Sequence, residues 1–181
     1  MISGRVFIAT SLDGYIAREN GDIEWLISRD DPAEDHGYNS FIGSIDGIVF
    51  GRGTYEAVIK MESWFYSKPV VVLSQSLMQE DIPDHLKTKV HVLNASPSEA
   101  VRYFASKGWK NVYVDGGKVI QSFLREGLIS EMTITQVPVL LGSGRPLFGP
   151  LKNDISLIHL ETVAFPSGLV QSKYRVDRKT T

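Results

Sequence analysis

The chain has 181 residues and a mass of 20.1 kDa, with 43% hydrophobic and 22% charged residues. This length predicts one domain over residues 1–181, and the composition disfavours global disorder. The formal charge of -2, without a lysine or arginine cluster, disfavours nucleic-acid binding, and the lack of cysteine excludes disulfides, thiol catalysis and cysteine-bound zinc. No apolar run approaches the ~20 residues of a membrane span, and the first residues lack a signal-peptide core. We therefore expect a cytoplasmic protein with no membrane partner.

Short apolar segments rich in valine, isoleucine and aromatic residues recur between turn residues and predict strands. The predicted strands cover residues 5–10, 46–51, 69–74, 89–93, 111–115, 131–138, 155–164 and 168–176. Some of them, such as Val70–Leu73, are continuous apolar runs, which are typical of strands covered on both faces.

Helical patterns lie between these strands. Ser96 and Glu99 form a capping box with Pro97 at the first helical position. The expected helices are one from this box to near Gly108, one over residues 119–124 ending at Gly127, and short ones after Pro32 and after Gly53. Strands and helices alternate through the first two thirds, and residues 164–168 predict a hairpin turn near the end. The expected fold class is α/β, with a mostly parallel sheet of about eight strands, helices on both faces and an antiparallel C-terminal hairpin.

Two glycine-rich stretches follow predicted strands and precede predicted helices, which is where open α/β sheets bind ligands. In the first, the backbone amides from Gly51 onward, the Arg52 guanidinium and the Thr54 hydroxyl are suited to hold a phosphate. In the second, Gly116 and Gly117 allow a strained turn beside a helix N-terminus. Each stretch alone is equally consistent with an ordinary strand-to-helix turn, and neither matches G-x-G-x-x-G or a Walker motif. Together they favour a dinucleotide.

Other candidate motifs are weaker. The four histidines show no metal-ligand spacing, so no metal site is expected. Residues 142–146 are a glycine-rich break for which a bulge or a wide turn is favoured. Asp30 and Asp31, with Glu34 and Asp35 nearby, are typical of a solvated helix start, although one of them could orient a polar heterocycle.

Several segments, in this order, resemble the dihydrofolate reductase-like superfamily, and within it the riboflavin-biosynthesis reductase branch. The resemblance covers essentially the whole chain and depends on four pieces: residues 9–17, Gly-Arg-Gly-Thr-Tyr-Glu at 51–56, Leu-Ser-Gln at 73–75 and Asp-Gly-Gly-Lys-Val at 115–119. The Ser-Leu-Asp-Gly run at 11–14 and the segment 138–148 are typical of the riboflavin-type branch. Each piece is weak alone, whereas the set in register is a strong signal.

The resemblance implies NADPH as the cofactor. It places Arg52, Ser74 and Gln75 at the adenosine 2′-phosphate, and Gly51 and Thr54 at the diphosphate. It also implies that the diphosphate is lined by Gly116, Gly117, Lys118 and Val119, and that Ala9 and the loop through Ile16 pack at the nicotinamide end. A dianionic 2′-phosphate needs guanidinium and hydroxyl donors, and both are present.

The implied activity is the NADPH-dependent reduction of an aminopyrimidine or pteridine-like substrate, similar to that of 5-amino-6-(5-phosphoribosylamino)uracil reductases. Such a reduction also needs a proton, for which Asp13, Asp30 and Asp31 are the candidate catalytic residues. The chain has Ile-Glu-Trp-Leu at 23–26 in place of the Pro-Trp of dihydrofolate reductases. The alternatives are a dihydrofolate reductase and a non-catalytic NADPH-binding domain. The resemblance also implies a homodimer.

Overall fold

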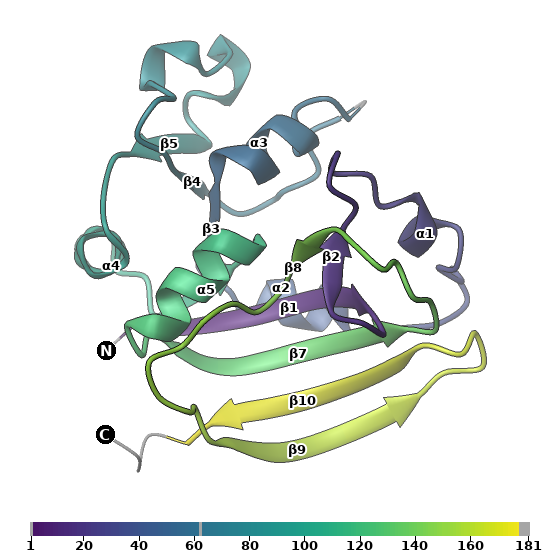
Figure 1. Cartoon of the computed structure of the whole chain (residues 1–181). Helices are drawn as coiled ribbons and strands as arrows, with labels where there is room; N and C mark the ends of the chain where they lie inside the picture. Colours follow the sequence, from purple (N-terminus) through teal and green to yellow (C-terminus); the bar gives the residue numbers. More distant parts are fainter. Residues whose placement is uncertain (1, 62, 178–181) are drawn as a thin grey trace.

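Figure 1 shows the computed structural model, which describes residues 2–61 and 63–177. The main sheet consists of β1 (Ser3–Ser11), β3 (Gly47–Gly51), β4 (Val70–Leu73), β5 (Val90–Leu93), β6 (Asn111–Val114), β7 (Ile129–Val137), β9 (Leu157–Ala164) and β10 (Val170–Val176). A small second sheet pairs β2 (Tyr15–Ala17) with β8 (Arg145–Pro146). The helices are α1 (Glu24–Ile27), α2 (Tyr38–Gly43), α3 (Arg52–Val58), α4 (Pro97–Ser106) and α5 (Gly117–Arg125), with 3-10 turns η1 (Gln79–Asp81) and η2 (Asp84–Leu86). None of the described helices is long and apolar enough to cross a membrane.

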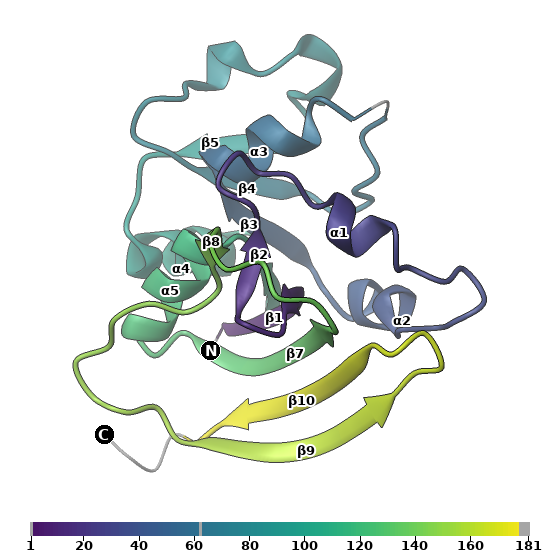
Figure 2. The same cartoon turned by 45° about the vertical axis from the view of Figure 1, so that its right-hand side comes forward.

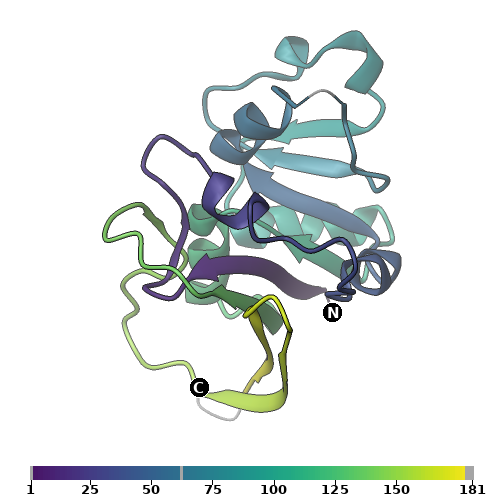
Figure 3. The same ribbon diagram turned by 90° about the vertical axis from the view of Figure 1, so that its right-hand side faces the viewer.

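The strand order in the main sheet is β5-β4-β3-β6-β1-β7-β10-β9. The described strands from β5 to β7 pair in parallel, whereas β10 is antiparallel to both β7 and β9 (Figure 1). Figure 3 shows the blue and teal strands β3 to β5 toward one end of the sheet and the yellow-green hairpin at the other. The predicted α/β fold, with a mostly parallel sheet of eight strands and an antiparallel C-terminal hairpin, is confirmed for the described residues.

Alternate side chains of the parallel strands pack into two cores, one on each face of the sheet. On one face Val71 belongs to a buried cluster with Phe104 of α4 and Phe123 of α5. On the other face its neighbour Val72 packs in a cluster with Tyr55 of α3, and apolar residues of α2 join the same cluster. Figure 2 shows α4 and α5 on one side of the central strands and α2 on the other. The prediction of helices on both faces is therefore confirmed.

The helix expected after Pro32 begins only at Tyr38. The Asp35 carboxylate accepts a hydrogen bond from the backbone N–H of Gly37 at 2.8 Å, and Asp31 forms the same kind of turn with the residue two positions on. Gly37 then has a φ of 80°. Aspartate side chains that bond to their own backbone compete with helix formation, so the acidic stretch is a loop and not a helix start.

The short β2–β8 pair and the turn between β9 and β10 complete the fold. Residues 142–144 turn as expected, but the chain then pairs with β2, with Arg145 opposite Ala17 and Pro146 opposite Tyr15. The hairpin turn predicted at 164–168 is confirmed, since the Phe165 N–H donates to the Leu169 carbonyl at 2.8 Å. The β2–β8 pair is too short to produce an alternating pattern in the sequence, and it was not predicted.

Candidate functional site

Two glycine-rich loops meet at the carboxyl edge of the sheet, one after β3 and the other after β6. A Cβ on Gly116 would lie 2.6 Å from the hydroxyl oxygen of Thr54, and a Cβ on Gly51 would lie 3.3 Å from a methyl of Val119. Gly116 also has a φ of 81°, so both conformation and space exclude a side chain there. The two stretches that the sequence suggested would act together are therefore in direct contact.

The β2–β8 pair covers the start of α5. A Cβ on Gly117 would lie 2.7 Å from the carbonyl oxygen of Pro146 and 3.3 Å from the Ile16 Cδ1 atom. One turn along the helix, the Gln121 side chain donates to the same carbonyl at 3.2 Å. Lys118 is exposed at this helix N-terminus. Three predicted cofactor residues, Ile16, Gly117 and Lys118, are thus gathered around the first turn of α5.

Arg52 joins the loop after β3 to the loop after β4. Its guanidinium donates to the Ser76 hydroxyl at 2.8 Å and to the Glu56 carboxylate at 2.5 Å. The Ser74 hydroxyl in turn accepts the Ser76 N–H at 3.2 Å, and Gln75 lies exposed between them. The arrangement brings Arg52, Ser74 and Gln75 to one place, with an exposed guanidinium and hydroxyls suited to an anion. The Glu56 carboxylate also lies here, bound to Arg52, and the sequence analysis assigned it no role.

Arg145 is a site residue that the sequence did not reveal. Its guanidinium lies 3.3 Å from the point a Cβ on Gly21 would occupy and 3.9 Å from the equivalent point on Gly53, and its Nε donates to the carbonyl of Glu19 at 3.2 Å. It therefore stands beside the first turn of α3 and adds a second guanidinium to this edge. The glycines around it in the sequence indicated only a turn.

Asp13 clamps two loops together. Its carboxylate accepts hydrogen bonds from the Ser11 hydroxyl at 2.6 Å and from the backbone N–H groups of Leu141 at 3.1 Å and Gly142 at 2.7 Å. The hydrogen bond from Ser11 contributes most to lowering the Asp13 pKa, and these amides lower it further. A carboxylate held in its ionised form in this way is suited to positioning the loop. A direct catalytic role for Asp13 stays a prediction.

A cavity of about 410 Å³ lies along the C-terminal half of β1, on the α2 side, and its volume is within the usual range for small-molecule sites. Its lining consists of Phe7, Ile8, Ala9, Leu26, Asp30, Asp31, Pro32, Glu34, Asp35, His36, Tyr38, Asn39, Thr135 and Leu169. We call it the β1 cavity. It brings together three predicted site residues, Ala9, Asp30 and Asp31, whereas Asp13 does not line it. The strand β6, which ends at the second glycine loop, is the neighbour of β1 in the sheet, although none of the described residues of the two glycine loops lines the cavity.

Asp115, at the carboxyl end of β6, is a second residue that sequence reasoning missed. Burial raises its pKa from 3.8 to about 6, against a smaller opposing effect of the hydrogen bond from the Gly116 N–H at 2.8 Å. Burial raises the pKa of Tyr38, which lines the β1 cavity, and the Asp115 charge raises it further. Asp115 does not line this cavity, but a carboxyl group with a pKa raised toward neutral pH is a candidate proton donor or acceptor. The sequence pointed only to the glycines that follow it.

Hydrogen bonds fix the acidic loop that forms one wall of the β1 cavity. The Glu34 carboxylate, with its side chain 8% exposed, accepts the Ser167 N–H at 2.8 Å and the Ser167 hydroxyl at 2.6 Å. His36 lies between two acids, with Nε2 3.1 Å from Glu34 and Nδ1 3.6 Å from Asp30. The hydrogen bonds from Ser167 are the main reason that the pKa of Glu34 is lowered. Glu34 is therefore a buried anchor to the β9–β10 turn, which corrects its interpretation as part of a solvated cluster.

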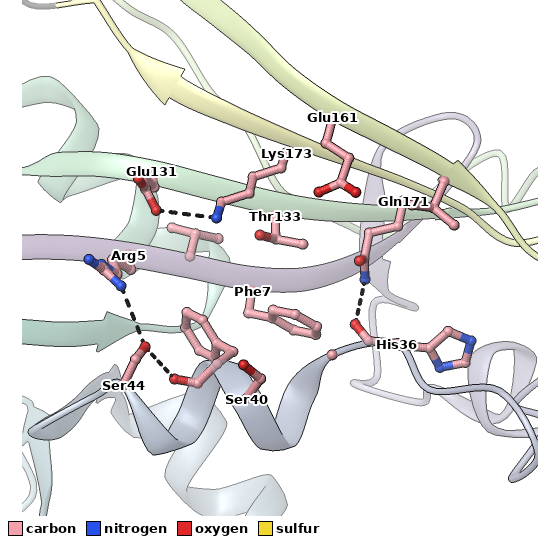
Figure 4. A pocket seen from close by; sticks show the side chains of 14 residues that line it. Arg5, Phe7, His36, Ser40, Ser44, Glu131, Thr133, Glu161, Gln171 and Lys173 are labelled. Carbon is pink, nitrogen blue, oxygen red and sulfur yellow. Dashed lines mark hydrogen bonds and ion pairs between the residues drawn. The ribbon is translucent and has the colours of Figure 1, made fainter.

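A second groove, of about 340 Å³, lies between α2 and the strands β1, β7, β10 and β9 (Figure 4). We call it the α2 groove. Arg5 reaches the Ser44 hydroxyl at 3.4 Å, Lys173 lies 3.8 Å from Glu131, and Glu161 points in from β9. Phe7 and His36 line both spaces, so the groove continues the β1 cavity along β1.

A mostly parallel sheet with touching glycine loops and a cavity along β1 defines an α/β protein of the kind in which small molecules bind at the carboxyl edge of the sheet. The chain belongs to the RibD C-terminal domain family, which matches residues 3–171. It is 34% identical over 156 residues to YwjB of Bacillus subtilis (strain 168), an uncharacterized protein, covering 84% of this chain and 86% of YwjB. It is also 31% identical over 186 residues to the uncharacterized YyaP of the same organism, covering 92% and 91%.

Solved structures agree. A putative riboflavin biosynthesis protein from Shewanella sp. PV-4 superposes with a TM-score of 0.91 and 39% identity, covering 98% of this chain and all of that one. A deaminase/5-amino-6-(5-phosphoribosylamino)uracil reductase from Thermotoga maritima superposes with a TM-score of 0.73 over 97% of this chain and 57% of its own, at 15% identity. The resemblance to the riboflavin-type branch and the dihydrofolate reductase-like fold are thereby confirmed.

Proposed function

We propose that the chain is an NADPH-dependent reductase of an aminopyrimidine or pteridine-like heterocycle, and that residues 1–181 act as one domain. The main support is the contact between the Thr54 and Gly116 loops, on the sheet whose strand β1 lines the β1 cavity, because a dinucleotide lying over those loops could extend toward Ala9. Membership of the RibD C-terminal domain family supports the same class of reaction, as does the name of the Thermotoga relative.

The residues at this edge fit NADPH. Arg52, Ser74 and Gln75 would hold the 2′-phosphate, since a guanidinium and hydroxyls already converge there. Gly116 and Gly117 have no side chains at the start of α5, and the Thr54 hydroxyl lies against this helix N-terminus, which is a kind of place where a diphosphate binds favourably. The remaining residues assigned to the cofactor are Gly51, Thr54, Lys118 and Val119 at the diphosphate, and Ala9 and Ile16 at the nicotinamide.

NADPH, when bound, supplies a hydride. The chain must then orient the heterocycle, exclude water and provide a proton. Asp30 and Asp31 line the cavity in which the heterocycle would lie. Asp115 is the group best suited to hold a proton, because burial raises its pKa to about 6. Asp13 would fix the loop over the nicotinamide end through its bonds to residues 141 and 142.

The decisive experiment measures NADPH binding and then NADPH oxidation at 340 nm with aminopyrimidines and with dihydrofolate. We expect saturable NADPH binding, and oxidation only when a heterocycle is supplied. Preferred turnover of dihydrofolate, inhibited by antifolates, would identify a folate reductase instead. Binding without oxidation of NADPH by any heterocycle would identify a non-catalytic nucleotide-binding domain.

We also propose a homodimer formed through β9. This strand is at the edge of the sheet and all of its residues are exposed. Exposed apolar edge strands are templates for pairing with another chain. If two copies of β9 pair antiparallel, Leu160 in the middle of the strand lies near the two-fold axis.

A further inference from the structure

We propose that the heterocyclic substrate of this chain bears no phosphate group, an inference that rests on the proposed reductase function. The observation is the charge of the β1 cavity. Asp30, Asp31, Glu34 and Asp35 line it, and no lysine or arginine is among its described lining residues. A phosphate monoester is close to a dianion at neutral pH and requires guanidinium, ammonium or N–H donors. The cavity offers the opposite charge.

The negative charge is a fixed part of the cavity wall. Glu34 is anchored to Ser167 by two hydrogen bonds of 2.8 and 2.6 Å, and its lowered pKa keeps it ionised. Asp31 and Asp35 each accept a backbone N–H of their own loop at 2.9 and 2.8 Å. These bonds hold the loop in place, so an entering phosphate would be repelled by the carboxylates. Moving the carboxylates away would cost the free energy of the hydrogen bonds that fix the loop.

Nearby basic side chains do not balance the four carboxylates. His36 is the basic side chain among the described lining residues, 3.6 Å from Asp30 and 3.1 Å from Glu34, and one imidazole carries at most one positive charge. The Arg29 guanidinium, which donates to a backbone carbonyl of α1 at 2.8 Å, is not among the lining residues.

In the α2 groove, Lys173 lies 3.8 Å from Glu131, and Arg5 shares the groove with Glu161. The groove thus holds two cations and two carboxylates, all labelled in Figure 4, and has no net positive charge for a phosphate tail that extends from the cavity.

The same carboxylates suit a different ligand. Ring N–H and amino groups of an aminopyrimidine or pteridine are donors, and ionised Asp30 and Asp31 are acceptors only. An uncharged or cationic ring with a neutral polar substituent fits this lining. The Thermotoga protein has a phosphoribosylamino compound in its name, but at 15% identity the comparison shows a shared fold alone.

The test uses a matched pair of ligands, 5-amino-6-(ribosylamino)uracil and its 5′-phosphate. NADPH binding is measured first, by fluorescence titration. The affinity of each ligand is then measured with NADP+ bound, and kcat/KM is measured from NADPH oxidation. We expect the unphosphorylated compound to be favoured about ten-fold or more in both measurements, with the difference shrinking as salt is raised. Equal or tighter binding of the phosphorylated compound would overturn the inference.

Substitutions test whether the carboxylates of the β1 cavity cause the preference against phosphate. Asp35→Asn keeps the oxygen that accepts the Gly37 N–H but removes a charge, so the preference against phosphate should fall about three-fold. Glu80→Gln, an exposed acid on η1, is the matched control and should leave the preference unchanged. Arg5→Gln should affect the two ligands equally. A loss of affinity confined to the phosphorylated compound in Arg5→Gln would place a phosphate in the α2 groove and contradict the inference.

The outcomes separate the two proposals. If NADPH does not bind, the proposed reductase function itself fails. If NADPH binds and the phosphorylated compound is preferred, only the inference about the substrate fails.

Discussion

The hydroxyl oxygen of Thr54 stands 2.6 Å from the point where a Cβ on Gly116 would lie, so the loops after β3 and β6 touch across one edge of the sheet. Position 116 therefore excludes a side chain for two reasons, the position of Thr54 and the positive φ of 81°. The steric effect and the conformational effect can be separated by substitution, because other glycines of the chain also have a positive φ but have open space where a Cβ would lie.

Gly116→Ala is expected to lower the free energy of unfolding by about 1–3 kcal/mol and to weaken NADPH binding about ten-fold or more. Its methyl would displace Thr54 from the diphosphate position. Gly127→Ala is the matched control, since Gly127 has a φ of 66° and nothing within 4 Å of the point where its Cβ would lie. It should lose stability by a similar conformational amount and bind NADPH normally. Urea unfolding and fluorescence titration measure both effects, and normal NADPH affinity in Gly116→Ala would contradict the cofactor position.

Arg52→Ala is expected to weaken NADPH binding by about 1.5–3 kcal/mol while barely changing NADH binding, because only NADPH has the 2′-phosphate. Glu56→Gln should have the opposite sign, since Arg52 loses its competing carboxylate partner at 2.5 Å. Titration with both cofactors measures the two effects, and Arg125→Ala on the exposed end of α5 is a control. Equal losses for NADPH and NADH would show that Arg52 does not contact the 2′-phosphate.

Asp115→Asn should stabilise the protein at neutral pH, and the gain should depend on pH. Burial raises the Asp115 pKa to about 6, so the folded state binds a proton more tightly than the unfolded state. The stability of the wild type therefore falls as pH rises from about 4 to about 6, whereas that of the variant does not. The gain should reach on the order of 2 kcal/mol above pH 6 and vanish below pH 4, as measured by urea unfolding. If Asp115 also supplies the proton, the variant loses turnover while it gains stability.

Asp46 provides the matched control with the opposite sign. Its carboxylate accepts the backbone N–H groups of Asn111 at 2.8 Å and Lys110 at 2.7 Å, and these bonds lower its pKa. A lowered pKa adds stability above the unfolded value, which is lost as the pH falls. Asp46→Asn should therefore destabilise the protein at pH 7 and have little effect at the lowest pH. Parallel pH profiles for the two variants would refute the environment assigned to Asp115.

Leu160→Lys tests the proposed dimer. Two copies of β9 paired about Leu160 would bring two lysines together at the axis, which should convert the dimer to a monomer. Light scattering after size-exclusion chromatography measures the mass. Leu151→Lys, an exposed leucine outside β9, should leave the mass unchanged. A wild-type monomer, or a dimer that persists in Leu160→Lys, would rule out this interface.

The fold was predictable because its signals are local. Val70–Leu73 is a strand that the sequence marks by an unbroken apolar run, and Ser96 does cap α4 as its spacing with Glu99 predicts. The loop at Asp31 and Asp35 was missed because aspartate side chains favour a helix start and an Asx turn alike, and only the tertiary structure decides between them.

The site was only partly predictable because some of its features depend on distant partners. Glu34 is buried through Ser167, which lies 133 positions further along the chain. The Arg145 guanidinium lies beside Gly21 and Gly53, and nothing in the sequence around Arg145 indicates that these distant glycines are its neighbours. The pKa of Asp115 depends on burial between neighbouring strands, whereas the glycines beside it could be recognised from sequence.

The most direct test of the proposed cofactor site is a titration of the wild-type protein with NADPH, in which binding is detected by the fluorescence of the cofactor. We expect saturable binding of one NADPH per chain well below about 1 mM, with weaker binding of NADH. No binding of NADPH at that concentration would contradict the proposal that the loops at Thr54 and Gly116 hold a dinucleotide.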